Sequence, residues 1–101
     1  PCTPCLVQPN PFTPDGDTYN EITTLDWPNM TTEGATIYIF TIRNVPVRKY
    51  ELPPQVNYSD ILVRSWDGLD QEGKRVPQGL YLYVVESDGR VVCNGTITLL
   101  R

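Results

Sequence analysis

Hydrophobic and polar residues alternate along most of the chain with the two-residue period of β-strands. The clearest case is the stretch 35–43, ATIYIFTIR, in which apolar side chains fall on both faces of the expected strand. A strand that is apolar on both faces is typical of the middle of a sheet. The pattern therefore predicts a central strand at 35–43.

Shorter segments with the same character follow one another between glycine and proline corners. Further strands are expected at 6–8, 19–27, 46–52, 61–66, 79–86, 90–94 and 96–100. The turn Ser87–Gly89 predicts a hairpin between 79–86 and 90–94. Gly95 interrupts the final run, where a bulge or bend would let one strand continue.

The turns recur every 8 to 12 residues, and no segment has a useful helical period. These features predict an all-β fold, an immunoglobulin-like or fibronectin-III-like antiparallel β-sandwich of about seven strands. Residues 1–17 hold five of the ten prolines and are expected to form an extended Pro-rich lead-in over the surface. Residues 18–101 are expected to form the sandwich domain.

Large side chains at alternating strand positions predict the core and its surroundings. They are Tyr38, Phe40, Trp66, Tyr81, Tyr83 and Val85. Such rings could instead form a platform for stacking a ligand, as in carbohydrate-binding modules. The core interpretation is favoured, because large rings dominate burial in sandwiches.

The chain has 101 residues, 12 acidic against 8 basic side chains, and no His. A net charge of −4 disfavours nucleic acid as a partner, since that binding depends on basic residues. No apolar run approaches the ~20 residues of a membrane helix. Without His, the commonest general base and every Ser–His or Cys–His pair are missing, so no enzymatic activity is expected. Because it begins at Pro1, the chain looks like a mature or excised piece.

One dense turn motif lies between the strands expected at 61–66 and 79–86. Asp67 can accept a hydrogen bond from a backbone N–H two residues on, Gly68 and Gly73 permit positive φ, and Pro77 presets the bend before Gly79. Acid–base or ligand roles for Asp67, Asp70 and Glu72 are the less favoured interpretation. The expected structural turn residues are Trp66, Asp67, Gly68, Asp70, Gly73, Pro77 and Gly79.

The stretch 65–83 resembles the Ig-like domain first described in flagellar hook-capping proteins, with its Trp-Asp-Gly-x-Asp turn, Gly-Lys-x-Val-Pro-x-Gly turn and Leu-Tyr-x-Tyr strand. The stretch 9–17, Asn-Pro-Phe-Thr-Pro-Asp-Gly-Asp after Pro9, is similar to the opening of the same modules. These modules occur at the C-termini of secreted bacterial proteins, including those linked to gliding motility and type IX secretion. The resemblance implies an exported bacterial protein at the cell surface or outside the cell.

Oxygen-bearing side chains cluster just after the lead-in. A density of this kind can suit Ca²⁺, which takes six to eight oxygen ligands, although such loops also form simple Asx turns. If calcium binds, the ligands to test are Asp15, Asp17, Asn20 and Glu21.

Three cysteines are present, two of them in a CxxC. A redox role is disfavoured, because the proline-rich context offers no helix N-terminus to lower a thiol pKa. A disulfide is expected instead, either Cys2 with Cys5 or one of them with Cys93. Asn29, Asn57 and Asn94 each begin an N-x-Ser/Thr pattern and are interpreted as turn and strand residues.

The expected function is that of a non-catalytic C-terminal module acting in secretion sorting, surface attachment or protein–protein docking. Its partners would be secretion machinery, neighbouring domains or identical copies. Two alternatives stay open: a structural subunit of an extracellular filament built by strand addition, and a carbohydrate-binding module.

Overall fold

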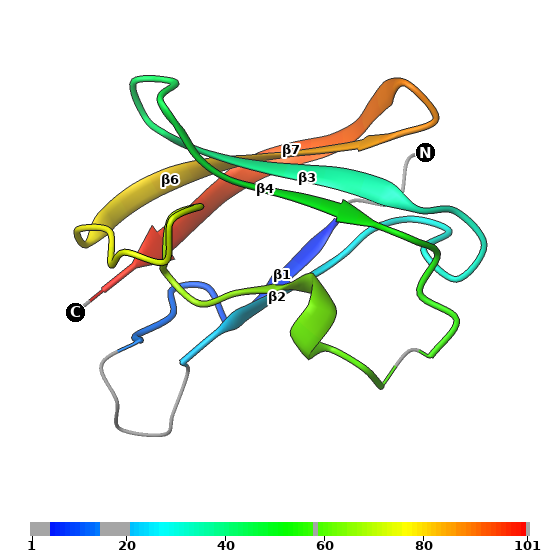
Figure 1. Cartoon of the computed structure of the whole chain (residues 1–101), viewed down its shortest axis with the longest axis horizontal. Coiled ribbons are helices and arrows are strands. Elements are labelled where there is room, and N and C mark those ends of the chain that lie inside the picture. The colour runs from blue at the N-terminus through cyan, green and yellow to red at the C-terminus, as the bar shows by residue number, and fades with distance from the viewer. Residues whose placement is uncertain (1–4, 15–20, 58, 101) are drawn as a thin grey trace.

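The computed structural model describes residues 5–14, 21–57 and 59–100, and they form two antiparallel sheets packed face to face (Figure 1). The elements are β1 (Leu6–Gln8), β2 (Thr23–Asp26), β3 (Ala35–Thr41), β4 (Pro46–Leu52), the 3-10 helix η1 (Leu62–Arg64), β5 (Ser65–Trp66), β6 (Gly79–Ser87) and β7 (Arg90–Leu99). One sheet has the order β1-β2-β5 and the other β4-β3-β6-β7. The prediction of a seven-stranded antiparallel β-sandwich is confirmed.

The core lies between the sheets and takes one face of each strand. Ala35, Ile37 and Ile39 of β3 are buried, together with Val85 of β6 and Ile97 of β7. β3 lies between β4 and β6, so its expected central position is confirmed. The hairpin of β6 and β7 is confirmed as well.

The segment 61–66 differs from the single strand expected there. Residues 62–64 form η1, and only Ser65 and Trp66 pair with β2. The apolar side chains Ile61, Leu62 and Val63 point to solvent, whereas Arg64 is buried at 1% exposure. In a strand, side chains would alternate between core and solvent. Here three consecutive side chains are exposed and the fourth is buried, a pattern that fits a helical turn.

The last strand runs without a break through Gly95, and its irregularity lies earlier, between the pairs Val85–Cys93 and Glu86–Val91. Gly95 is opposite Tyr83, and a Cβ at this position would lie 2.9 Å from the Tyr83 ring. The prediction of a bulge or bend at Gly95 is therefore wrong in its position. The absence of a side chain at Gly95 instead leaves room for the Tyr83 ring on the neighbouring strand.

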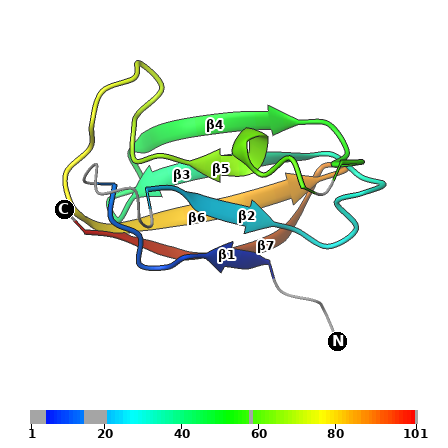
Figure 2. The same cartoon turned by 90° about the horizontal axis from the view of Figure 1, so that it is seen from below.

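The described part of the lead-in contributes to both sheets. A short strand forms at 6–8, as expected, and the structure shows that it pairs with β2. Farther on, Phe12 forms a parallel bridge with Leu99 of β7, and its side chain is fully buried in the core. Residues 5–14 thus run from one sheet to the other and do not remain on the surface alone (Figure 2).

Candidate functional site

The carboxylates of the turn after β5 are bonded to the backbone of the turn itself. Asp67 Oδ1 accepts a hydrogen bond from the Leu69 N–H at 3.1 Å, the contact expected from the sequence. Asp70 Oδ1 accepts from the N–H groups of Glu72 and Lys74, both at 2.9 Å. A carboxylate that closes two turns in this way is held in place by its own loop.

The glycines of the same turn adopt the conformations that the sequence suggested. Gly68 has φ 81° and Gly73 has φ 84°, values that side-chain-bearing residues rarely adopt. Gly79 begins β6 with φ 151°, directly after the bend at Pro77. The backbone of 67–79 is thus a rigid hairpin-like connection between β5 and β6.

Aromatic rings fix this connection to the core. The Trp66 ring lies 5.4 Å from the Phe12 ring and 5.2 Å from the Tyr81 ring, centroid to centroid. The Trp66 Nε1–H donates to the Leu69 carbonyl at 2.9 Å, and the Tyr81 hydroxyl donates to the Pro77 carbonyl at 2.6 Å. The last contact has the geometry of the tyrosine corner that many Greek-key sandwiches carry at this crossover. Trp66 and Tyr81 are core residues, as expected.

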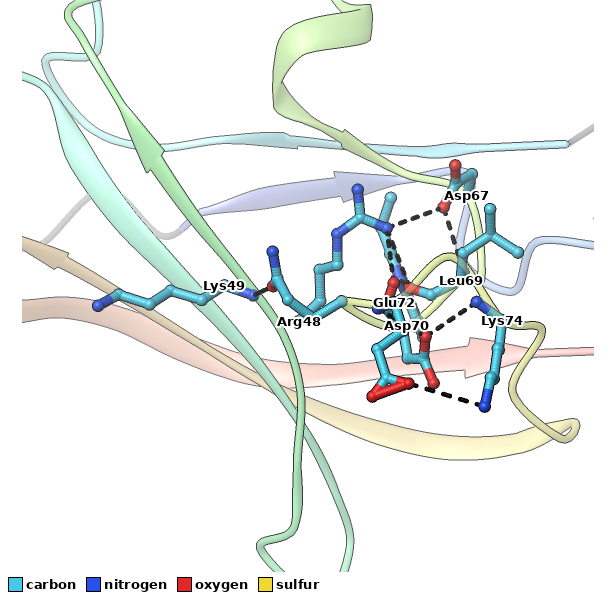
Figure 3. A network of polar contacts seen from close by, with 9 residues as sticks. Arg48, Lys49, Asp67, Leu69, Asp70, Glu72 and Lys74 are labelled. Carbon is cyan, nitrogen blue, oxygen red and sulfur yellow. Dashed lines mark hydrogen bonds and ion pairs between the residues drawn. The ribbon is translucent and has the colours of Figure 1, made fainter.

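Arg48 of β4 holds the turn against the edge of the four-stranded sheet (Figure 3). Its Nη1 donates to the carbonyls of Leu69 at 3.2 Å and Asp70 at 3.3 Å, and it lies 3.6 Å from Asp67 Oδ1. Through these contacts, the Arg48 guanidinium fixes the position of the loop. They favour the structural interpretation of Asp67 and Asp70, whose carboxylates are engaged in building the loop.

Gln71 extends the same contact along the outer edge of β4. Its backbone N–H donates to the Val47 carbonyl at 2.9 Å, and its side-chain Oε1 accepts from the Lys49 N–H at 2.8 Å. Because β4 is the edge strand of its sheet, these are hydrogen bonds that a neighbouring strand would otherwise make.

Two aromatic side chains assigned to the core or its surroundings lie on the opposite face of the sheet. Tyr38 and Phe40 are half-buried on the outer face of β3, and their rings are 6.1 Å apart with planes 14° from parallel. Leu82 and Val84 of β6 lie directly opposite them, so the four side chains form one apolar patch. Tyr38 and Phe40 therefore belong to the surroundings of the core and not to the core itself, since Ile37 and Ile39 occupy the inward face of β3.

A groove of about 730 Å³ runs beside this patch, over β3 and β4. Its lining is Tyr38, Phe40, Pro46, Val47, Arg48, Lys49, Glu51 and Gln71. Lys49 Nζ is 3.2 Å from Glu51 Oε1 and 5.7 Å from the centre of the Tyr38 ring. The Tyr38 hydroxyl is 3.3 Å from Glu86 Oε1, which fixes the ring. The groove is therefore mainly apolar, with a charged rim of both signs.

Three of the four expected calcium ligands, Asp15, Asp17 and Asn20, lie outside the described residues, so the structure does not place them. Glu21 is described and half-buried. Within the described ranges, no three His, Cys, Asp or Glu side chains come together as a metal site. The calcium interpretation stays a prediction.

Of the disulfide pairings left open by the sequence, the structure has Cys5 with Cys93, whose Cα atoms are 5.9 Å apart. The bond joins the residue before β1 to β7 across 88 positions of sequence. Of the N-x-Ser/Thr positions, Asn29 lies in a turn with φ 61° and Asn94 lies on β7, in keeping with their interpretation as turn and strand residues.

Three long-range hydrogen bonds were not predicted from the sequence. Arg64 Nε donates to Asp26 Oδ1 at 2.9 Å, which ties η1 to β2. The Asn10 amide donates to the Thr96 carbonyl and accepts from the Thr98 N–H, both at 2.9 Å. The partners are 38, 86 and 88 residues apart, so no local spacing signals them. The Asn-Pro-Phe motif itself was visible, but its role at the edge of β7 was not.

A scan against family models and a search of the curated proteins both find no match for the chain. What the fold and the site define is a small disulfide-linked β-sandwich with a structurally engaged acidic turn and an apolar outer sheet face. Among the described residues, no helix has the length and apolar character needed to cross a membrane.

Proposed function

We propose that the chain is a non-catalytic docking module of an exported bacterial protein, which attaches its parent to other proteins at the cell surface or in the export machinery. The observation that carries the proposal is the apolar patch of Tyr38, Phe40, Leu82 and Val84. In a two-layer sandwich the outward face of a sheet is normally polar, so an apolar cluster that is only half-buried on this face is typical of an interaction surface.

Further features support an exported docking module. The disulfide is typical of small domains in oxidising compartments outside the cytoplasm. The acidic residues Asp67 and Asp70, which were the candidates for acid–base chemistry, are bonded within their turn. The turn motifs that resemble hook-capping Ig-like domains point to the same kind of parent.

The docking function is tested with the whole chain immobilised through its C-terminus. The envelope fraction of the organism that encodes it should supply a protein that binds the purified chain directly. The double substitution Tyr38→Ser with Phe40→Ser should lower that affinity at least about tenfold, because central aromatic anchors carry most interface energy. Val56→Ser is the matched control, because Val56 is 83% exposed and belongs neither to the patch nor to the groove beside it. An affinity that the double variant leaves unchanged would contradict the proposal.

Glycan binding is the second candidate, favoured by the nearly parallel rings of Tyr38 and Phe40 beside a polar rim. Affinity electrophoresis in gels containing soluble glucan, xylan or chitin oligomers tests it. If a glycan slows the migration of the unsubstituted chain but not of the double variant, glycan binding replaces protein docking as the proposed function.

Filament assembly through the last strand has less support. The outer edge of β7 from Thr96 to Leu100 is already used by Asn10 and Phe12 of the same chain. Strand addition there would first have to displace these contacts.

A further inference from the structure

We propose that the outer edge of β4 binds an extended peptide segment of a partner protein, which adds to the sheet as a parallel strand next to Tyr50. The inference rests on the proposed docking function and names the kind of partner. It is carried by the hydrogen bonds at the two edges of the four-stranded sheet and by the groove beside β4.

The edge of β7 shows a complete arrangement of this kind. Asn10 bonds through its side-chain amide to the Thr96 carbonyl and the Thr98 N–H. Two residues on, Phe12 bonds through its backbone to the Thr98 carbonyl at 3.0 Å and the Leu100 N–H at 3.0 Å. Each of the two thus bonds a carbonyl and the N–H two positions later, which is the spacing of a parallel ladder. Along this edge, Asn10 therefore imitates a strand residue with its side-chain amide, and Phe12 then pairs through its backbone as a parallel strand does.

The edge of β4 has the first half of the same arrangement. Gln71 bonds to the Val47 carbonyl and the Lys49 N–H, again a carbonyl and the N–H two positions later. The next pair of groups along this edge is the Lys49 carbonyl and the Glu51 N–H. They face outward because alternate residues of an edge strand direct both backbone groups away from the sheet, and Lys49 does so. No described residue of the chain bonds to the Lys49 carbonyl or to the Glu51 N–H and carbonyl.

An extended backbone offers a donor and an acceptor at the spacing that this edge requires, and unlike a single side-chain amide it continues along the edge to the Glu51 carbonyl. One peptide residue opposite Tyr50 would donate to the Lys49 carbonyl and accept from the Glu51 N–H. The residue two positions later would donate to the Glu51 carbonyl. This is the strand-addition mode of peptide recognition, in which main-chain bonds hold the peptide and neighbouring pockets select its side chains.

The surroundings of the edge define the sequence that fits. The groove lined by Tyr38, Phe40 and Pro46 adjoins the edge near Lys49 and suits an apolar side chain. Glu51 lies on the same outer face, and its side chain is 74% exposed even though it pairs with Lys49, so its carboxylate can also accept a basic side chain of the peptide. The partner segment is therefore extended, with an apolar residue followed by a basic one on the same face of its strand.

The test uses a phage-displayed library of random octapeptides selected on the immobilised whole chain, followed by titration of the selected synthetic peptide. Glu51→Pro removes the outward N–H while leaving the bonds to β3, since proline is tolerated on edge strands where its nitrogen faces solvent. Glu51→Ala keeps the N–H and removes only the charge. We expect Glu51→Pro to weaken binding about tenfold or more, and Glu51→Ala no more than about threefold.

A second measurement does not depend on the folding of the proline variant. In the unsubstituted chain, the selected peptide should slow hydrogen exchange of the Glu51 amide and leave exchange in β7 unchanged. The proposal is overturned if the selected peptides bind Glu51→Pro as tightly as the unsubstituted chain, if they leave the Glu51 amide unprotected, or if selection yields no binding peptide. It is also overturned if the free chain dimerises and Glu51→Pro restores the monomer, because a second copy then takes the edge.

Failure of this inference can be told apart from failure of the docking function. A partner protein that loses affinity in the Tyr38→Ser, Phe40→Ser variant and keeps it in Glu51→Pro docks on the sheet face alone. The opposite result is a peptide whose binding depends on the Glu51 N–H, with no partner protein that loses affinity in the Tyr38→Ser, Phe40→Ser variant. That result supports the site at the edge of β4 and excludes docking on the apolar patch.

Discussion

Tyr50 shows how the packing around one side chain sets its protonation. Its hydroxyl is buried and has no hydrogen-bond partner among the described residues, and the Arg48 guanidinium lies 4.9 Å from the centre of its ring. Burial raises the pKa of Tyr50 from its usual value of 10.0 to about 12, because the charged phenolate loses its hydration. The positive charge of Arg48 acts in the opposite direction but is the weaker effect, and Asp67 adds a smaller upward shift.

This pKa predicts a loss of stability in alkaline solution. Below pH 10 Tyr50 is protonated in both states; from there to about pH 12 the unfolded chain releases the proton while the folded chain keeps it. The free energy of unfolding therefore falls as pH rises through this window, by up to about 1.4 kcal/mol per pH unit from this residue. Tyr50→Phe should remove that contribution, so the variant gains relative stability between about pH 9 and about pH 11 in urea unfolding.

At neutral pH the same substitution should change stability by less than about 1 kcal/mol, because it deletes a buried hydroxyl to which no residue in the described ranges bonds. Equal pH dependence of the two proteins would show that the hydroxyl is hydrated in solution and its pKa ordinary.

At the scale of single elements, local alternation predicted the long strands well. β3, β4, β6 and β7 begin and end within a few residues of the expected positions, because proline and glycine corners limit them. The turn at 67–79 was predictable for the same reason, since its Asx contacts and positive φ values depend on neighbours in sequence. Local chemistry was sufficient wherever the deciding contacts are local.

The remaining features depend on contacts between distant residues. Both faces of β3 are apolar, so its sequence could not tell which face packs in the core and which carries the Tyr38–Phe40 patch. The apolar run 61–63 has the composition of a strand, yet residues 62–64 form η1, and the buried Arg64 at its end pairs with the distant Asp26. A rule based on spacing alone cannot find such partners.

The Arg64–Asp26 ion pair should contribute strongly to the attachment of η1 to β2. Asp26→Ala would leave a guanidinium that is 1% exposed without its carboxylate, and we expect the free energy of unfolding to fall by about 3 kcal/mol. Urea unfolding followed by tryptophan fluorescence measures the change, since Trp66 directly follows this region. The matched control is Glu72→Ala, which breaks an exposed pair with Lys74 and should cost less than about 0.5 kcal/mol. Similar losses in the two variants would contradict the argument.

At the scale of the whole molecule, the N-terminal segment closes one side of the sandwich. β1 belongs to the three-stranded sheet, whereas Asn10 and Phe12 bond to β7 of the other sheet. The disulfide from Cys5 to Cys93 lies at the start of this segment, and the buried Phe12 ring lies near its end. The side of β7 is thereby covered, and the edge of β4 is left as the more accessible flank of the four-stranded sheet.

The disulfide should act mainly on the unfolded chain. It closes a loop of 88 positions, and a cross-link of that length lowers the entropy of the unfolded chain enough to stabilise the fold by about 2–5 kcal/mol. The double substitution Cys5→Ser with Cys93→Ser should lower the free energy of unfolding by that amount in guanidinium chloride. Reduction of the unsubstituted chain should give the same decrease, and the double variant should not respond to reductant.

The folded state, in contrast, should change little when the bond is removed. Phe12 stays buried and Asn10 keeps its two bonds to β7, so these contacts hold the segment without the cross-link. Hydrogen exchange at Thr98 and Leu100, whose N–H groups bond to Asn10 and Phe12, therefore distinguishes the two origins of stability. If their protection falls only in step with global stability, the bond acts on the unfolded chain. If exchange at these two amides becomes fast while the β3–β6 ladder stays protected, the disulfide is instead required to hold the segment in place.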